Sequence, residues 1–230
     1  MTIKTSKKII NLGLLFSLSL SAILLFTDFN IINIGKEIYQ LSNRILFFLA
    51  LFIFQMRFFF LINFIKKNST THQVTSRLKK PFLADALTGI FLFCILPLVL
   101  TFLNIYFNHS LNYWYLIFIL LYIFGTSITL ISEYQRRKWK LENTAKSKLY
   151  KDGLFKYARY INYFGEAITQ PSLWFIATGV WWISLIALLY QLYDFSFVHI
   201  PKQDNYLLKK YGEHFKEISI QGKKIIPFIY

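Results

Sequence analysis

The sequence predicts an all-α membrane protein, a polytopic bundle of about six transmembrane helices. The chain of 230 residues is 55% hydrophobic and 20% aromatic, and only 16% of its residues are charged, whereas soluble domains carry about 25%. Its apolar residues form blocks close to the roughly 20 residues that a helix needs to cross a bilayer. These blocks are apolar on every face, unlike the alternating strands of a membrane β-barrel.

The apolar blocks follow one another along most of the chain. They cover residues 9–27, 45–65, 82–107, 112–132 and 160–200. The first block follows a basic start, as in a signal peptide, but its length and the later spans favour an uncleaved first span. The last block, of about 40 residues, can form two short or tilted helices with a turn near Gly179.

The distribution of Lys and Arg predicts the topology. Of the 26 basic residues, 23 fall in residues 1–8, 66–81, 133–159 and 201–230, whereas residues 28–44 hold two. The positive-inside rule places the four basic segments in the cytoplasm. An even number of spans follows, so we expect six, with both termini cytoplasmic, in a bacterial inner membrane. We expect residues 1–230 to form one integral membrane domain with a cytoplasmic tail, 201–230.

Charge and motif content exclude several classes of function. The net charge of +15 could suggest nucleic acid, but basic cytoplasmic loops explain it, so we expect no nucleic-acid partner. The single cysteine, Cys94, excludes a disulfide framework. The four histidines show no ligand spacing, and we expect no metal. Rossmann, P-loop and G-x-S-x-G motifs are missing from the sequence.

Arg57 and Gln55 lie inside the second apolar block, within "LFFLALFIFQMRFFFLINFI". An arginine at mid-bilayer costs roughly 2.5–3.5 kcal/mol on insertion scales and is a functional candidate by default. The alternative is an arginine that snorkels to the interface or is paired for packing. Asp85, at the start of the third block, is more simply explained as an interfacial charge.

A polar face is predicted in "YARYINYFGEAI". Asn162, Tyr163 and Glu166 are spaced three and four residues apart, so they share one side of a helix, and Arg159 joins them three residues earlier. We expect this edge to face an enclosed, charged pocket, where it could hydrogen-bond a carboxamide and a ribose. The alternative is an interfacial helix with an aromatic belt and a snorkelling arginine.

"GLFKYARYINYFGE" (153–166) resembles the "GLWxYSRHPNYFGE" signature of the steroid 5-alpha-reductase superfamily, and the closest branch is its bacterial members of unassigned substrate. The tail "IPKQDNYLLKKYGEHFKEISIQGKKIIPFIY" resembles that branch's "IPxxExxLLxxxxEYxxYxxxTxxFIPxF" and the ending of sterol reductases. "SEYQRRKWK" and "FQMRFFFLINFIKK" resemble further family segments. The last 100 or so residues carry the specific matches.

The resemblance implies a membrane reductase that uses NADPH to reduce an activated carbon–carbon double bond in a lipidic, steroid- or isoprenoid-like substrate. It also implies a set of cofactor-binding residues by position: Glu133, Gln135, Lys140, Arg159, Asn162, Tyr163, Glu166 and Asp204. Of these, Asn162, Tyr163 and Glu166 match the nicotinamide-facing motif, and Lys140 stands where steroid enzymes have a phosphate-binding arginine. The catalytic candidates are Arg57, Gln55 and Tyr163.

Three positions depart from the family pattern. Tyr160 and Ile161 replace the His-Pro of the signature, and Phe54 stands where steroid-reducing members have a tyrosine that polarises the enone oxygen. The departure at Phe54 argues against a steroid and leaves the proton donor open between Tyr160, Tyr163 and a Gln55–Arg57 pair.

Two other functions compete with a reductase. Isoprenylcysteine carboxyl methyltransferases share "RHPxYxG" and a similar tail, which "KKYGEHFKEI" resembles, and would use S-adenosylmethionine. Glu166, directly after the motif glycine, favours the reductase, because such methyltransferases usually lack it. A non-catalytic membrane protein is the third hypothesis, which Tyr160 and Ile161 allow. The lipid substrate and the oligomeric state stay open.

Overall fold

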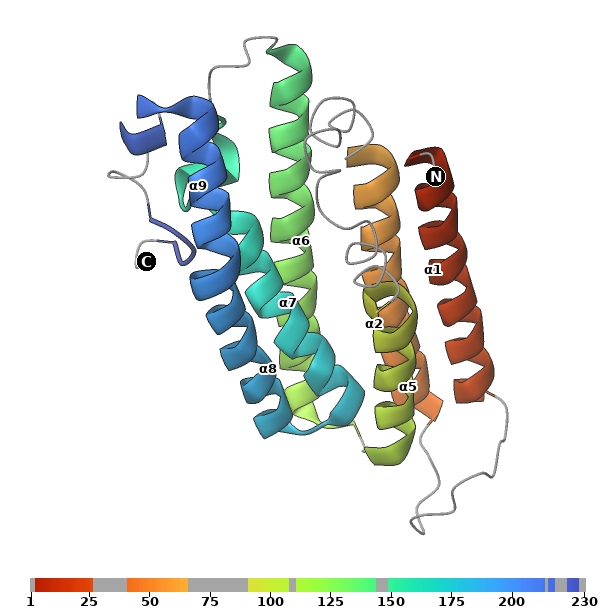
Figure 1. Ribbon diagram of the computed structural model, residues 1–230. Coiled ribbons are helices and arrows are strands. Elements are labelled where there is room, and N and C mark those ends of the chain that lie inside the picture. The colour runs from red at the N-terminus through yellow and green to blue at the C-terminus, as the bar shows by residue number, and fades with distance from the viewer. Residues whose placement is uncertain are drawn as a thin grey trace. The chain divides into compact units, whose positions relative to one another are not determined.

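We describe the fold from a computed structural model, over residues 3–26, 41–65, 91–107, 111–143, 149–213, 215–217 and 223–227. Every regular element in these ranges is a helix, which confirms the predicted all-α class (Figure 1). The described helices group into two compact units, Met1–Ile117 with Leu173–Val180, and Phe118–Ser172 with Trp181–Tyr230. The expectation of a single domain stays a prediction, and Asp85 lies outside the described residues.

The first unit contains α1 (Ile3–Phe26), α2 (Leu41–Phe60) and α5 (Leu96–Phe107). The π-helical turn η1 (Leu61–Ile65) follows α2, and a second, η2 (Phe91–Ile95), precedes α5. Helix α1 packs against both α2 and α5.

Polar side chains link α1 to its two neighbours. The Gln55 amide donates to Ser17 at 2.8 Å, and Thr101 donates to Ser21 at 2.9 Å. Ser17, Ser21, Gln55 and Thr101 are all fully buried. Because lipid offers no hydrogen-bond partners, such contacts between helices help to fix their register within a bilayer.

The second unit contains most of α6 (Tyr113–Glu142) and of α7 (Ile161–Thr178). These helices meet at Gly125 and Gly165, where an added Cβ on either glycine would lie 2.7 Å from the backbone oxygen of the other. The short 3-10 helix η3 (Gly153–Lys156) precedes α7. Glycine is required at Gly153, since its φ of 61° is left-handed and a Cβ would collide with Gln135.

Beyond α7, the chain turns at Gly179, whose φ is 68°. This confirms the turn predicted there. Helix α8 (Trp181–Tyr193), the π-helical segment η4 (Asp194–His199) and α9 (Ile200–Tyr211) then follow as one run of helix. The polar tail predicted from residue 201 therefore begins inside α9. This helix carries its apolar residues on one side and its lysines on the other, as an amphipathic helix does.

Three described helical stretches are long and apolar enough to cross a membrane: Ser42–Phe60, Tyr113–Glu142 and Trp181–Tyr211. Asn11–Phe26 and Leu96–Phe107 are shorter apolar helices. Large apolar side chains on these helices point outward, such as Phe197 at 70% exposed and Leu12 at 65%. Such surfaces suit lipid rather than water. Six spans and cytoplasmic termini remain predictions.

Candidate functional site

The candidate site begins at the turn that leads into α7. Arg159 and Tyr160 lie in this turn, because α7 starts at Ile161. The expectation that Arg159 shares the helical face of Asn162 is therefore wrong. The two backbone N–H groups instead donate to the carbonyl oxygens of Lys223 (2.9 Å) and Lys224 (2.8 Å). The C-terminal segment 223–227 thus straps the start of α7.

Asn162, on the first turn of α7, reaches across to α6. Its amide nitrogen donates to Glu133 at 3.2 Å, and Arg136 donates to both oxygens of the same carboxylate. Glu133 is 8% exposed. The close approach of Gly125 and Gly165 brings the two helices near enough for this contact. The structure therefore joins two predicted cofactor-binding residues, Glu133 and Asn162, in one partly buried polar group.

A second polar group joins the turn to α9. Arg159 forms an ion pair with Asp204, with nitrogen and oxygen 3.4 Å apart, and the Tyr160 hydroxyl donates to the same carboxylate. The Arg159 side chain is 9% exposed. Burial, and then the hydrogen bond to Asp204, raise the pKa of Tyr160 well above its ordinary value. Tyr160, which replaces the histidine of the family signature, holds the predicted residue Asp204 in place.

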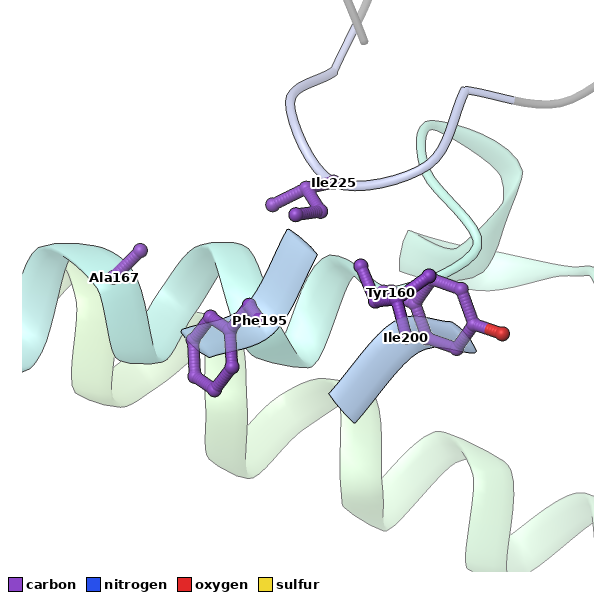
Figure 2. Packing of buried hydrophobic residues seen from close by; sticks show 5 residues of the cluster. All are labelled: Tyr160, Ala167, Phe195, Ile200 and Ile225. Carbon is purple, nitrogen blue, oxygen red and sulfur yellow. The ribbon is translucent and has the colours of Figure 1, made fainter. Parts of the chain in front are cut away.

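Tyr163 lies on a different side of α7 from Asn162. Its ring stacks on Tyr160 (centroids 5.5 Å apart) and on Phe195 (4.6 Å). Figure 2 shows Tyr160 and Phe195 in the buried cluster that also includes Ala167, Ile200 and Ile225. Glu166 is half-buried one turn beyond Asn162. The motif thus sends Asn162 toward α6 and Tyr163 toward η4, on two faces rather than one.

Gln135 and Lys140 have different surroundings. The Gln135 side chain accepts a hydrogen bond from the Leu154 N–H at 3.0 Å, so it ties α6 to η3. Lys140 is exposed near the end of α6, within electrostatic range of Arg136, Lys210 and Glu133. Lys140 therefore belongs to a cationic surface of a kind that suits phosphates.

Gln55 and Arg57 belong to the first unit, whereas the other predicted site residues belong to the second. Gln55 is held by Ser17 at a contact between helices. Arg57 is 2% exposed, and its guanidinium lies over the rings of Phe58 (4.7 Å) and Phe54 (5.5 Å). Burial between aromatic rings argues against snorkelling to an interface.

The cavity described beside the motif is apolar. Its volume is about 390 Å³, and it is lined by Phe124, Ile128, Leu154, Tyr157, Ile161, Phe164 and Pro227. It therefore differs from the charged pocket that the sequence led us to expect, and the polar edge of the motif is directed at Glu133 instead.

Sequence reasoning missed a histidine–carboxylate pair in η4. The His199 ring nitrogen Nε2 lies 3.0 Å from an oxygen of Asp194. The two residues are five apart, which separates them on an α-helix but brings them together on a π-helical turn. The α-helical spacing of three or four residues therefore does not predict this pair. The one remaining hint of the pair in the sequence is "YDFSFVH", where polar residues interrupt the apolar block.

Long apolar helices, outward-facing aromatic and aliphatic side chains and buried polar groups define an integral membrane protein. A family model matches residues 56–221, and the chain belongs to that family, described as "Protein of unknown function (DUF1295)". The family is generally related to the membrane domains of steroid 5-alpha-reductases and isoprenylcysteine carboxyl methyltransferases. No curated protein and no solved structure matches the chain.

Proposed function

We propose that this protein is a membrane reductase that uses NADPH to reduce an activated carbon–carbon double bond in a lipidic substrate. One observation carries the proposal: the partly buried contact between Glu133 and Asn162, two positions that the family resemblance assigns to the cofactor. Polar and charged groups inside a membrane protein are expensive, and they are typical of functional sites.

The chemistry of the residues fits the polar parts of a dinucleotide. Glu133 offers carboxylate oxygens that can accept from ribose hydroxyls, and Asn162 offers an amide that can both donate and accept. Arg136, Lys140 and Lys210 supply positive charge near this end of α6. Arginine and lysine are the side chains that bind phosphate oxygens. These side chains therefore suit both the ribose and the phosphates of a dinucleotide.

Each part of the site has a task in this proposal. Bound NADPH would supply the hydride. Asn162 and Glu133 orient the polar head of the cofactor, and the cations hold its phosphates. The apolar groove beside Ile161 suits a lipid chain. A hydrogen-bond donor near the substrate stabilises the charge that develops as the double bond is reduced.

Thermal unfolding of the full chain in mild detergent tests the proposal. A ligand that binds only the folded state stabilises it by about 2.7 kcal/mol at 100 times its Kd. We expect NADPH to raise the unfolding temperature and S-adenosylmethionine to leave it unchanged. Stabilisation by S-adenosylmethionine alone would favour a methyltransferase, and stabilisation by neither would favour a non-catalytic protein.

A matched pair of amide variants locates the binding. Asn162→Ala is expected to weaken NADPH binding about 10- to 100-fold, the loss typical of a hydrogen bond to a charged group. Asn143→Ala, at an exposed asparagine beyond α6 whose side chain bonds only the Trp139 carbonyl among the described residues, should leave binding unchanged. Equal affinity for the two variants would remove Asn162 from the site.

A further inference from the structure

The apolar groove beside the motif can hold only the hydrocarbon part of a ligand. All its lining residues belong to the second unit, and they expose only apolar atoms to its volume of about 390 Å³. This volume lies within the range of small-molecule pockets. A ligand with hydroxyl or carbonyl groups along its length would bury them there without a hydrogen-bond partner, at a cost in free energy. The part of a ligand that enters the groove is therefore hydrocarbon.

One wall of the groove belongs to a membrane-spanning helix. Phe124 and Ile128 of α6 line the groove and lie within the candidate span Tyr113–Glu142. Phe124 is 54% exposed, and an outward-facing aromatic ring on such a span suits lipid. A hydrocarbon chain can therefore enter the groove sideways from the bilayer.

The groove reaches η3, and a lysine flanks it there. Residues three apart share one face of a 3-10 helix. Leu154 and Tyr157, joined by a backbone hydrogen bond of 3.1 Å, accordingly both line the groove. Phe155 points into the core at 8% exposed. Lys156 therefore occupies the remaining side of the turn, next to the groove face, and it is exposed.

Positive charge exceeds negative charge at this end of the groove. Pro227 of the C-terminal segment 223–227 also lines the groove. Residues 149–158 and 223–227 together contain one carboxylate, Asp152, and four lysines: Lys151, Lys156, Lys223 and Lys224. Lysines close to a membrane surface attract anionic lipid headgroups. A negatively charged headgroup placed here meets a net positive charge while its tail stays in the groove.

The groove adjoins the residues that we assign to the cofactor. Ile128 directly precedes Thr129, and Ile161 directly precedes Asn162. The Thr129 hydroxyl donates to the Asn162 carbonyl oxygen at 3.4 Å, and the Asn162 amide donates to Glu133 at 3.2 Å. A lipid in the groove therefore lies next to this polar group.

We propose that the groove binds a membrane lipid that has one hydrocarbon tail and a negatively charged headgroup. The tail lies against Phe124 and Ile128, and the headgroup lies near Lys156 and Lys223. That this lipid is the substrate rests on the proposed reductase function, whereas its binding does not. The inference narrows the substrate to anionic lipids and excludes neutral ones.

Photo-crosslinking of the full chain in phosphatidylcholine vesicles tests the proposal without NADPH. The probe is an alkyl phosphate that carries a diazirine in its tail, and the fatty alcohol of the same length is the uncharged control. Peptide mass spectrometry should find Phe124, Ile128 and Ile161 labelled about threefold more by the phosphate, the ratio expected for an exposed charge pair. Equal labelling by the alcohol would overturn the proposal. Labels spread evenly over the outward-facing apolar residues would also overturn it.

Charge variants test the position of the headgroup. The double variant Lys156→Gln, Lys223→Gln should lower labelling by the alkyl phosphate about two- to fivefold and leave labelling by the alcohol unchanged. Lys138→Gln is the matched control, at an exposed lysine of α6 that pairs with Glu142, and should change neither. Unchanged labelling by the phosphate in the double variant would contradict the proposal.

A bulky side chain tests the position of the tail. Ile128→Trp should fill the groove and remove the label at Ile161, whereas Ile123→Trp, at an outward-facing position of α6 that does not line the groove, should keep it. If Ile128→Trp fails to fold, Phe124→Ala removes part of the same wall and should lower the label at Ile161. A label at Ile161 that persists in the folded variant would overturn the proposal. If the chain binds no NADPH but shows the expected labels, the reductase function fails and the lipid site stands.

Discussion

Gly125 of α6 and Gly165 of α7 lie against each other. The backbone of each helix occupies the space that a side chain at the other glycine would need. A Cβ on Gly165 would lie 2.5 Å from Thr129 Oγ1, and one on Gly125 would lie 2.6 Å from Thr169 Oγ1. Each helix thus presents a glycine and, four residues later, a threonine. This packing of small residues is typical of close helix pairs in membranes, and it lets Asn162 reach Glu133.

Gly165→Ala should destabilise the protein by about 1–3 kcal/mol, the range for overpacking a filled contact. The close atoms include backbone, which cannot rotate away. Thermal unfolding in detergent measures the loss. Gly13→Ala is the matched control, because the nearest atom there is the Cys94 sulfur, at the end of a side chain that can move. Equal stability of the two variants would show that the α6–α7 contact tolerates a methyl group.

Ile225→Ala should loosen the C-terminal strap. Ile225 is 1% exposed in the cluster with Tyr160 and Phe195 (Figure 2), and truncating a buried isoleucine costs about 2–5 kcal/mol. Limited proteolysis should then cleave near residue 223 faster than in the wild type. Ile186→Ala, at a position 58% exposed, serves as the control. Unchanged cleavage would mean that backbone hydrogen bonds alone hold the strap.

Tyr160→Phe should change how stability depends on pH. The raised pKa of Tyr160 in the folded state means that its proton is held more tightly there than in the unfolded chain. The corresponding stability is complete below pH about 10 and falls as pH rises further. Unfolding measured between pH 8 and 11 should therefore show a smaller decline in Tyr160→Phe. Parallel declines in both proteins would contradict a raised pKa of Tyr160 in the folded state.

Variants at Gln55 and Ser17 separate a structural role from a catalytic one. Breaking their buried hydrogen bond leaves one polar group unsatisfied, at about 1–3 kcal/mol. If Gln55 only ties α2 to α1, then Ser17→Ala, Gln55→Ala and the double variant should show a strong coupling energy. The three should also have similar turnover. Loss of turnover in Gln55→Ala alone would assign Gln55 to the chemistry.

The sequence predicted much of the fold, but it predicted only part of the candidate site. Apolar block length predicted the helical membrane class, and Gly179 marked the turn between α7 and α8. Asn162 was expected at a polar site and was found against Glu133. Arg159 was misplaced, because periodicity cannot locate the first residue of a helix when no capping residue marks it. His199 was missed, because its pairing with Asp194 needs a π-helical turn.

The sequence by itself determined that this chain belongs in a membrane. It also determined that a cluster of polar residues, including Arg159, Asn162 and Glu166, lies near the start of α7. Both properties follow from composition and local spacing, since lipid requires long apolar helices whose backbone groups bond internally. Only the tertiary structure decided which polar groups meet. Glu133 and Asn162 are 29 residues apart, and Arg159 and Asp204 are 45 apart. Their contacts depend on how closely helices approach, which glycines and buried side chains set together.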